Sequence, residues 1–281
     1  MLLLKYLISQ INWNLRCPSD IFYFFSYCKN GDNVVGIIKG DNRFTYLNKM
    51  IKNSILSDQI EDFYDIDILI IGFSGIDKNH YILGTGINLD KILENNNIKY
   101  IVTGMSNNEL DKLAKMYCFN VIELMKDEGF VKDNAFLTAI GIINYLQKDD
   151  LNIASRSYLV LGYGNISFYL INLFKAYKVS YKIYPMNDFE RKILSLNNEA
   201  ITDTLYGNED IIINTVPKNH SCDYNLLVGA KIIDVASYPY GFSSDKINEY
   251  NIDYKILSKI PSIYTPKSAA ELVKKGINTI V

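Results

Sequence analysis

Several residue types that mark common protein classes are scarce in this sequence. Its 281 residues include four cysteines, two histidines and one tryptophan. The cysteines form no Cys-x-x-Cys pair and have no histidine at metal-ligand spacing; they are Cys17, Cys28, Cys118 and Cys222. We therefore expect reduced thiols in a cytoplasmic protein, with neither a disulfide nor a structural zinc site.

The sequence also lacks an excess of positive or negative charge. Lysine and arginine together number 29, and aspartate and glutamate 31, which gives a formal net charge of −2. This balance argues against a basic surface for nucleic acid. Arginine is the rarer cation, and its positions are Arg16, Arg43, Arg156 and Arg191.

Long apolar runs are also missing, including at the N-terminus. Lys5 and Gln10 interrupt the run that begins at Met1–Leu4 long before it could span a membrane. The apolar residues of this segment instead share one helical face: Leu4, Leu7, Ile8, Ile11 and Leu15. We expect the extension 1–33 to form a helix that docks on its own chain or on a partner. An interfacial membrane helix is disfavoured, because the polar face carries Asn and Gln rather than many cations.

Residues 34–133 have the rhythm of a parallel α/β domain of flavodoxin-like type. Apolar runs alternate with helix-like stretches such as Phe44–Leu56 and Asn107–Tyr117. The runs lie at 34–38, 68–73, 100–105 and 120–125. A linking helix, 134–150, follows, with its apolar residues on one face: Phe136, Ile140, Ile143 and Leu146. The sequence thus predicts an α/β chain of two lobes joined by this helix.

The most informative feature is a glycine turn after the next apolar run. Tyr158–Leu161 stops at Gly162-Tyr163-Gly164, and a helical pattern follows. In a dinucleotide-binding turn the first glycine allows the bend, and the second lets the backbone approach a pyrophosphate. Amides at the helix start, here Asn165 and Ile166, would hold the phosphates. Ser167 takes the place of the third glycine, and we interpret it as a strained substitute. The alternative is an ordinary turn between a strand and a helix.

Residues 151–265 complete a Rossmann dinucleotide-binding domain. Further strands are expected at 180–184, 211–213, 232–235 and 254–257, which we predict to form a six-stranded doubly wound sheet. Thr265 and Pro266 are typical of a helix start and open a final helix, 266–281, that would cross back to the first domain. We expect ligands at the carboxyl ends of the strands, in a cleft between the lobes.

The choice of cofactor depends on the end of the second Rossmann strand. An acidic residue about 20 positions beyond the glycine turn would bind the ribose hydroxyls of NAD, whereas a nearby arginine would favour NADP. This chain has Met186 and Asn187 there, and Asp188 comes slightly late. The sequence therefore does not decide between NAD and NADP. S-adenosylmethionine, which binds after a similar turn, is a minor alternative.

Seven short segments stand in order along the chain: Gly40-Asp41-Asn42-Arg43, Thr103-Gly104-Met105-Ser106-Asn107, Asn134 with Thr138 and Gly141, Gly162-Tyr163-Gly164, Ile213-Asn214-Thr215-Val216-Pro217, Asp234-Val235-Ala236-Ser237 and Thr265-Pro266-Lys267-Ser268-Ala269. Together they resemble the A subunit family of bacterial dipicolinate synthase. The resemblance implies an NAD(P)-dependent oxidoreductase that works with a flavoprotein-like B subunit. In sporulation this pair converts the cyclic dicarboxylate product of the lysine-pathway aldol step into dipicolinate. The resemblance also implies cofactor contacts from Thr215, Val216, Pro217 and Asp234, and substrate contacts from Asn107, Asn134, Thr138 and Ser237.

Three side chains are candidates for direct roles. Arg43 follows a strand and is placed to anchor a substrate carboxylate, although an ion pair with Asp41 is the alternative. Lys267 lies in the first turn of the final helix, where an anion is favoured, although a surface lysine is equally expected there. His220 is placed to transfer a proton beside nicotinamide or is simply solvated. No histidine follows it, which disfavours the hydroxyacid dehydrogenase reaction, since that reaction uses a late histidine.

The chain also departs from the family pattern. Ile140 stands where the linking helix usually has a glutamate, and Tyr238 stands where an arginine usually follows the Asp-x-Ala-Ser segment. Leu137 replaces a proline and Ser262 a glycine. A carboxylate that handles a proton and a guanidinium that clamps a carboxylate are thus missing from their usual positions. The second hypothesis is therefore a non-catalytic nucleotide-binding subunit that stabilises or regulates a partner. Self-association is open under either hypothesis.

Overall fold

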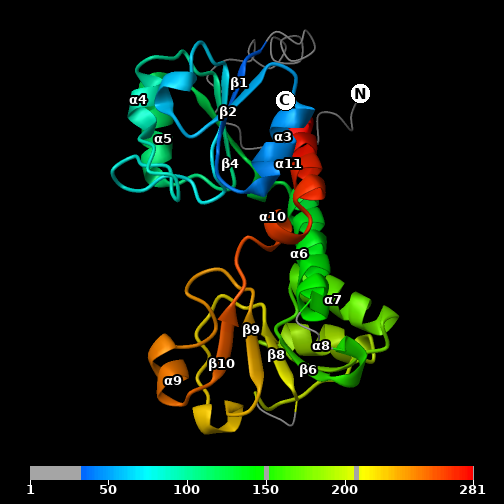
Figure 1. Ribbon diagram of the computed structural model, residues 1–281. Coiled ribbons are helices and arrows are strands. Elements are labelled where there is room, and N and C mark those ends of the chain that lie inside the picture. Colours follow the sequence, from blue (N-terminus) through cyan, green and yellow to red (C-terminus); the bar gives the residue numbers. More distant parts are fainter. Residues whose placement is uncertain (1–32, 149–151, 206–208, 281) are drawn as a thin grey trace. The chain divides into compact units, whose positions relative to one another are not determined.

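The computed structural model describes residues 33–148, 152–205 and 209–280 (Figure 1). The docking helix predicted for the extension 1–33 lies outside the described residues, which include only position 33 of that extension. The described chain forms two compact units. The first contains 33–38, 51–122 and 277–280, and the second contains 39–50 and 123–276. Each unit is built on its own sheet, as the α/β prediction requires.

The first unit has a five-stranded sheet in the order β2-β1-β3-β4-β5. Its strands are β1 (Val35–Ile38), β2 (Ser54–Ser57), β3 (Ile68–Ile70), β4 (Tyr100–Thr103) and β5 (Asn120–Glu123). The pairs β1 with β2, β1 with β3 and β3 with β4 are parallel. Each of the four predicted apolar runs contains one of these strands. The prediction of a helix over Phe44–Leu56 is wrong in its second half. The helix α3 (Asn42–Met50) ends early, and Asn53 turns the chain with a left-handed φ of 59° into β2.

Two helices cover one face of this sheet. They are α4 (Leu89–Leu93) and α5 (Asn108–Tyr117), and short 3-10 turns lie at Ile60–Asp62 and Leu124–Lys126. Leu110 and Leu113 of α5 pack with Leu69 and Ile101 of the sheet in one buried cluster. Helix α5 begins where the sequence predicted, because the Asn107 side chain accepts a hydrogen bond from the Leu110 amide, 3.0 Å away.

The second unit has a parallel sheet in the order β10-β9-β8-β6-β7. Its strands are β6 (Ser157–Leu161), β7 (Ser180–Tyr184), β8 (Ile211–Asn214), β9 (Lys231–Asp234) and β10 (Asp253–Ile256). The sheet therefore has five strands, and the prediction of six is wrong. Beside β7, where the order of a doubly wound sheet requires another strand, a single parallel bridge joins Ile183 to Ile201. Asn198, with a φ of 54°, turns the chain just before this bridge.

Helices lie on both faces of the second sheet. They are α6 (Glu128–Lys148), α7 (Asn165–Ala176), α8 (Asp188–Leu196), α9 (Ser244–Glu249) and α10 (Ile260–Tyr264), with 3-10 turns at Ile153–Ser155 and Tyr224–Leu227. Helix α11 (Pro266–Ile280) follows α10 and does not cover this sheet (Figure 1). Alternate residues of β6 face opposite sides: Val160 packs with α6 and α7, and Leu161 packs with residues around α9. This alternation confirms the doubly wound Rossmann architecture.

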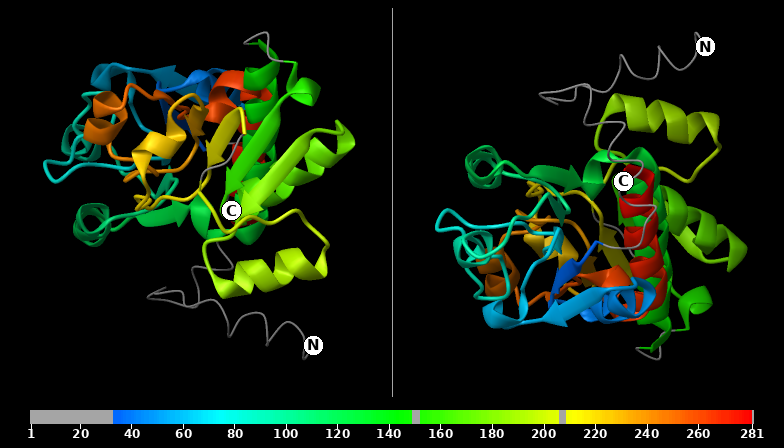
Figure 2. Two further views of the ribbon diagram at one scale, coloured as in Figure 1. Left: turned by 90° about the horizontal axis from the view of Figure 1, so that it is seen from below. Right: turned by 90° about the horizontal axis from the view of Figure 1, so that it is seen from above.

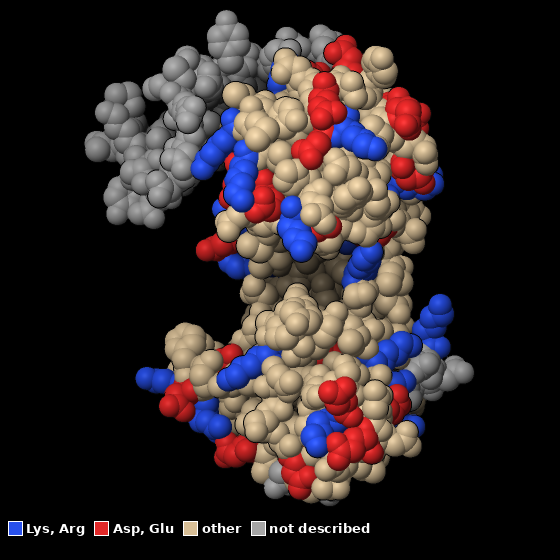
Figure 3. Space-filling view, turned by 90° about the vertical axis from the view of Figure 1, so that its left-hand side faces the viewer, with Lys and Arg blue, Asp and Glu red and all other residues tan. Residues whose placement is uncertain are grey.

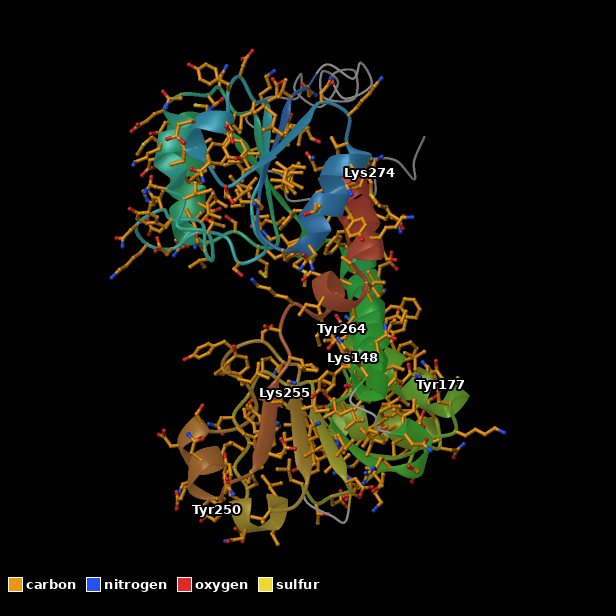
Figure 4. The ribbon with its side chains drawn as sticks, in the orientation of Figure 1. Lys148, Tyr177, Tyr250, Lys255, Tyr264 and Lys274 are labelled. Atoms are coloured by element: carbon orange, nitrogen blue, oxygen red, sulfur yellow. The ribbon has the colours of Figure 1, made fainter. Side chains whose placement is uncertain are left out.

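Helix α11 packs along α6 within the second unit (Figure 2). A side chain at Gly276 would collide with Leu124 and Phe130, so glycine allows this close approach. Lys274 of α11, labelled in Figure 4, donates to the Met50 carbonyl at the end of α3 over 2.9 Å. Acidic and basic residues are interspersed over each unit on the face in Figure 3. In the part of the chain that the structure describes, no helix is both long and apolar enough to cross a membrane.

Candidate functional site

The glycine turn joins β6 to α7 and depends on Gly162 for its shape. Gly162 has a φ of 83°, which side-chain-bearing residues rarely adopt. A Cβ at this position would overlap Val216 Cγ2. The Gly162 amide donates a hydrogen bond to the Tyr184 carbonyl over 2.9 Å. The turn is therefore held against the ends of both β7 and β8, and only glycine fits.

Gly164 has a different role, at the start of α7. It is the N-cap residue, with a φ of −91°, and no side chain caps the helix. A Cβ at Gly164 would meet nothing within 4 Å, and the first turn of α7 has no acidic residue. The partial positive charge of the helix start thus faces open space. The backbone at Gly164, Asn165 and Ile166 fits the pyrophosphate of a dinucleotide.

Ser167 corrects the interpretation of a strained substitute for the third glycine. Its side chain is fully buried and its Oγ lies 2.7 Å from Thr215 Oγ1. Because Thr215 donates its own hydroxyl proton to the Leu161 carbonyl over 2.8 Å, Ser167 is the donor to Thr215. These two bonds connect α7, β8 and β6, so the serine stabilises the turn. They also engage the Thr215 hydroxyl, which sequence reasoning assigned to the cofactor.

The segment that follows β7 lies next to the glycine turn and contains Met186 and Asn187. Asn187 is the N-cap of α8, and its Oδ1 accepts from the Glu190 amide over 2.9 Å. Glu190 in turn accepts from the backbone amides of Met186, at 2.9 Å, and Tyr163, at 3.1 Å. Glu190 is absent from the predicted site. The Asn-x-x-Glu spacing of a capping box was the available signal, but its glutamate bonds the glycine turn rather than the N-cap amide.

A buried network lies behind the loops that follow β8 and β9. Asp234 is fully buried, and each of its carboxylate oxygens accepts two hydrogen bonds. Oδ1 accepts from Asn214 Nδ2 and the Ala236 amide, and Oδ2 accepts from the Gly241 amide and the Tyr254 hydroxyl, all within 2.7–3.0 Å. This geometry argues against the predicted cofactor contact of Asp234. The carboxylate instead fixes the loop 235–241.

His220 belongs to the same network. Its ring is buried, and Nε2 donates to Asn214 Oδ1 over 3.0 Å, since that oxygen also accepts from the Val216 amide. Burial lowers the pKa of His220, and the nearby Asp234 carboxylate opposes this shift. Burial and the hydrogen bond to Asp234 both raise the pKa of Tyr254. These contacts favour a structural role for His220 over proton transfer.

The two predicted carboxylate anchors have different surroundings. Arg43 is buried, and its Nε donates to Asp41 Oδ1 over 2.8 Å, so the ion pair named as the alternative is present. Lys267 is exposed in the first turn of α11. Its neighbour Ser268 lines a groove between α6 and α11. Of the two cations, Lys267 is the more accessible to an anion.

The remaining predicted contacts, with substrate from Asn107, Asn134, Thr138 and Ser237 and with cofactor from Val216 and Pro217, lie at four places: the cap of α5, helix α6 and the loops after β8 and β9. Asn107 uses its side-chain amide locally, because it caps α5 and donates to the Ile76 carbonyl over 2.7 Å. Thr138 is buried in α6 and donates to the Asn134 carbonyl over 2.8 Å. Ser237 is exposed after β9. Pro217 is exposed after β8, and Val216 beside it lies against the glycine turn.

The parallel sheet, the Gly-x-Gly turn and the open helix start define the class of the second unit as a Rossmann dinucleotide-binding fold. A scan against models of protein families found no match, and neither did a search of the curated proteins. Solved structures do match. The A subunit of dipicolinate synthase from Bacillus halodurans is 19% identical, with a TM-score of 0.72 over 88% of this chain and 97% of that one.

Two further structures extend this comparison. The A chain of dipicolinate synthase from Bacillus subtilis is also 19% identical, with a TM-score of 0.68 over 88% of this chain and 95% of that one. D-lactate dehydrogenase from Salmonella is 11% identical, with a TM-score of 0.57 over 88% and 95%. The chain therefore has the two-unit fold of these dipicolinate synthase and D-lactate dehydrogenase structures.

Proposed function

We propose that the chain is a divergent dipicolinate synthase A subunit, which would make it an NAD(P)-dependent oxidoreductase of a small cyclic dicarboxylate. The observation that carries this proposal is the open start of α7 at Gly164, next to a turn that only glycine at 162 can form. The fold that the chain has in common with two dipicolinate synthase structures supports the substrate class. The proposed setting is the cytoplasm during sporulation, and the proposed partner is a flavoprotein-like B subunit.

In this proposal the amides of Asn165 and Ile166 hold the pyrophosphate, and the loop after β8 supports the nicotinamide half. Nicotinamide would accept a hydride as the substrate ring is oxidised. The network around Asp234 keeps the loop after β9 in place. Ser237 of this loop is a proposed substrate contact. Lys267 supplies positive charge for a substrate carboxylate, and Asn107, Asn134, Thr138 and Arg43 stay proposed substrate contacts.

A non-catalytic nucleotide-binding subunit is the second candidate. The observation in its favour is that the side chains best suited to chemistry are engaged elsewhere. Arg43 is paired with Asp41, and His220 is buried against Asn214. Ile140 and the exposed Tyr238 stand where the resemblance leads us to expect a glutamate and an arginine. Such a protein would bind the nucleotide and stabilise its partner without turnover.

A titration followed by an activity assay tests both candidates. The melting temperature is measured with NADH, NADPH and S-adenosylmethionine, because a ligand at about 100 times its Kd adds about 2.7 kcal/mol of stability. Stabilisation by a nicotinamide cofactor is expected. Dipicolinate formation with the dicarboxylate substrate and the B subunit then supports the enzyme, whereas binding without turnover supports the second candidate. No response to either nicotinamide cofactor refutes both.

A further inference from the structure

The carboxylate of Glu190 lies between the glycine turn and the segment that follows β7. Its Oε2 accepts from the Tyr163 and Met186 amides, and its Oε1 accepts from Asn187 Nδ2 over 3.3 Å. The first of these amides belongs to the Gly-x-Gly turn and the second follows β7. One carboxylate thus bridges the two segments that flank a bound adenosine ribose in a Rossmann unit.

The residues after β7 supply no charge of their own at this place. Pro185, Met186 and Asn187 are uncharged, so the carboxylate comes from one turn inside α8. Asp188 shares this first turn with Glu190. The start of a helix carries partial positive charge and favours negative side chains there, so both carboxylates are stabilised at this position.

Two nearby cations are paired with carboxylates. Arg191, which follows Glu190 on α8, forms an ion pair with Asp203. Lys175 of α7 forms an ion pair with Glu199 over 2.5 Å. A ribose 2′-phosphate would bring further negative charge next to Glu190, whereas a 2′-hydroxyl would bring a hydrogen-bond donor.

We propose that Glu190 makes the site selective for NAD over NADP, by accepting a hydrogen bond from the ribose 2′-hydroxyl and repelling a 2′-phosphate. This inference rests on the proposed function and specifies its cofactor. Asn187 keeps α8 in place through its own capping bond, so the carboxylate is presented on a fixed helix start. Selectivity then depends on one charge that a substitution can remove while the shape is kept.

Isothermal titration with NADH and with NADPH tests the proposal on the full chain. Wild-type protein is expected to bind NADH at least tenfold more tightly than NADPH. Glu190→Gln keeps the size and one acceptor oxygen, and it should reduce that ratio at least fivefold. Glu249→Gln is the matched control. Glu249 lies on α9, which precedes the opposite edge strand β10, and it pairs with Lys246, so the ratio should not change.

Equal affinities of wild type for the two cofactors, or an unchanged ratio in Glu190→Gln, overturn the proposal. A second measurement does not depend on any variant. Competition on wild type by 5′-AMP and by adenosine 2′,5′-bisphosphate compares the adenosine halves alone. 5′-AMP should bind more tightly. If wild type binds neither dinucleotide, the proposed function fails and this inference fails with it; if it binds both equally, only this inference fails.

Discussion

The two glycines of the turn should respond to alanine in opposite ways. Gly162→Ala places a methyl group on backbone with a φ of 83° and against Val216 Cγ2. Gly164→Ala places the same group on backbone with a φ of −91°, where no atom lies within 4 Å. Gly162→Ala should therefore lower the stability of the fold. Gly164→Ala should affect only the binding of a ligand that approaches the start of α7 from outside.

The magnitudes follow from these geometries. Left-handed backbone costs a residue with a side chain about 1–2 kcal/mol. The overlap with Val216 adds about 1–3 kcal/mol of overpacking. Together they should lower the melting temperature of Gly162→Ala by roughly 4–20 °C. Gly164→Ala should stay within about 1 kcal/mol of wild type, because alanine at a compatible position reduces the entropy of the unfolded chain.

Calorimetric melting and NADH titration of both variants distinguish the two roles. Gly164→Ala should fold like wild type and bind NADH at least tenfold more weakly, because its methyl group occupies the approach of the pyrophosphate. Gly162→Ala should show the loss of stability. Wild-type affinity in Gly164→Ala would refute the assignment of the phosphate site, and wild-type stability in Gly162→Ala would refute the steric argument.

Two further predictions concern the network around Asp234. Asp234→Asn turns an amide NH2 toward either the Gly241 or the Ala236 amide, so at least one buried donor loses its acceptor. We expect calorimetry to detect a loss of about 3 kcal/mol or more, while the surface change Asp245→Asn has little effect. Because burial holds the pKa of His220 below its unfolded value of 6.5, His220 contributes stability that is present above that pH and is lost as the pH falls toward the folded pKa. Urea unfolding from pH 7.5 to 5 should therefore show a shallower pH dependence for His220→Gln than for wild type, and parallel curves would contradict the burial of His220.

Local patterns in the sequence predict much of this fold. Gly162 and Gly164 locate the nucleotide turn because a bend between a strand and a helix needs those residue types within three positions. Thr265 and Pro266 predict the start of α11 for the same reason, since the residues that begin a helix act over one turn. The apolar runs predict strands because both faces of a parallel sheet are buried. The edge strand β2 is only half-buried along most of its length, and its pattern is correspondingly weak.

The features that the sequence does not reveal depend on partners distant along the chain. Ser167 reads as a poor third glycine until Thr215, 48 positions away, supplies an acceptor for its hydroxyl. Asp234 reads as a cofactor ligand at a strand end until Asn214, 20 positions away, takes up its oxygen in the interior. In both cases the side chain is a buried donor or acceptor whose hydrogen bonds are satisfied within the fold. A polar residue at the end of a strand can therefore be assigned to a ligand only after its internal partners are known. Glu190 combines an internal role, since its carboxylate accepts a hydrogen bond from the glycine turn, with the proposed contact to the cofactor.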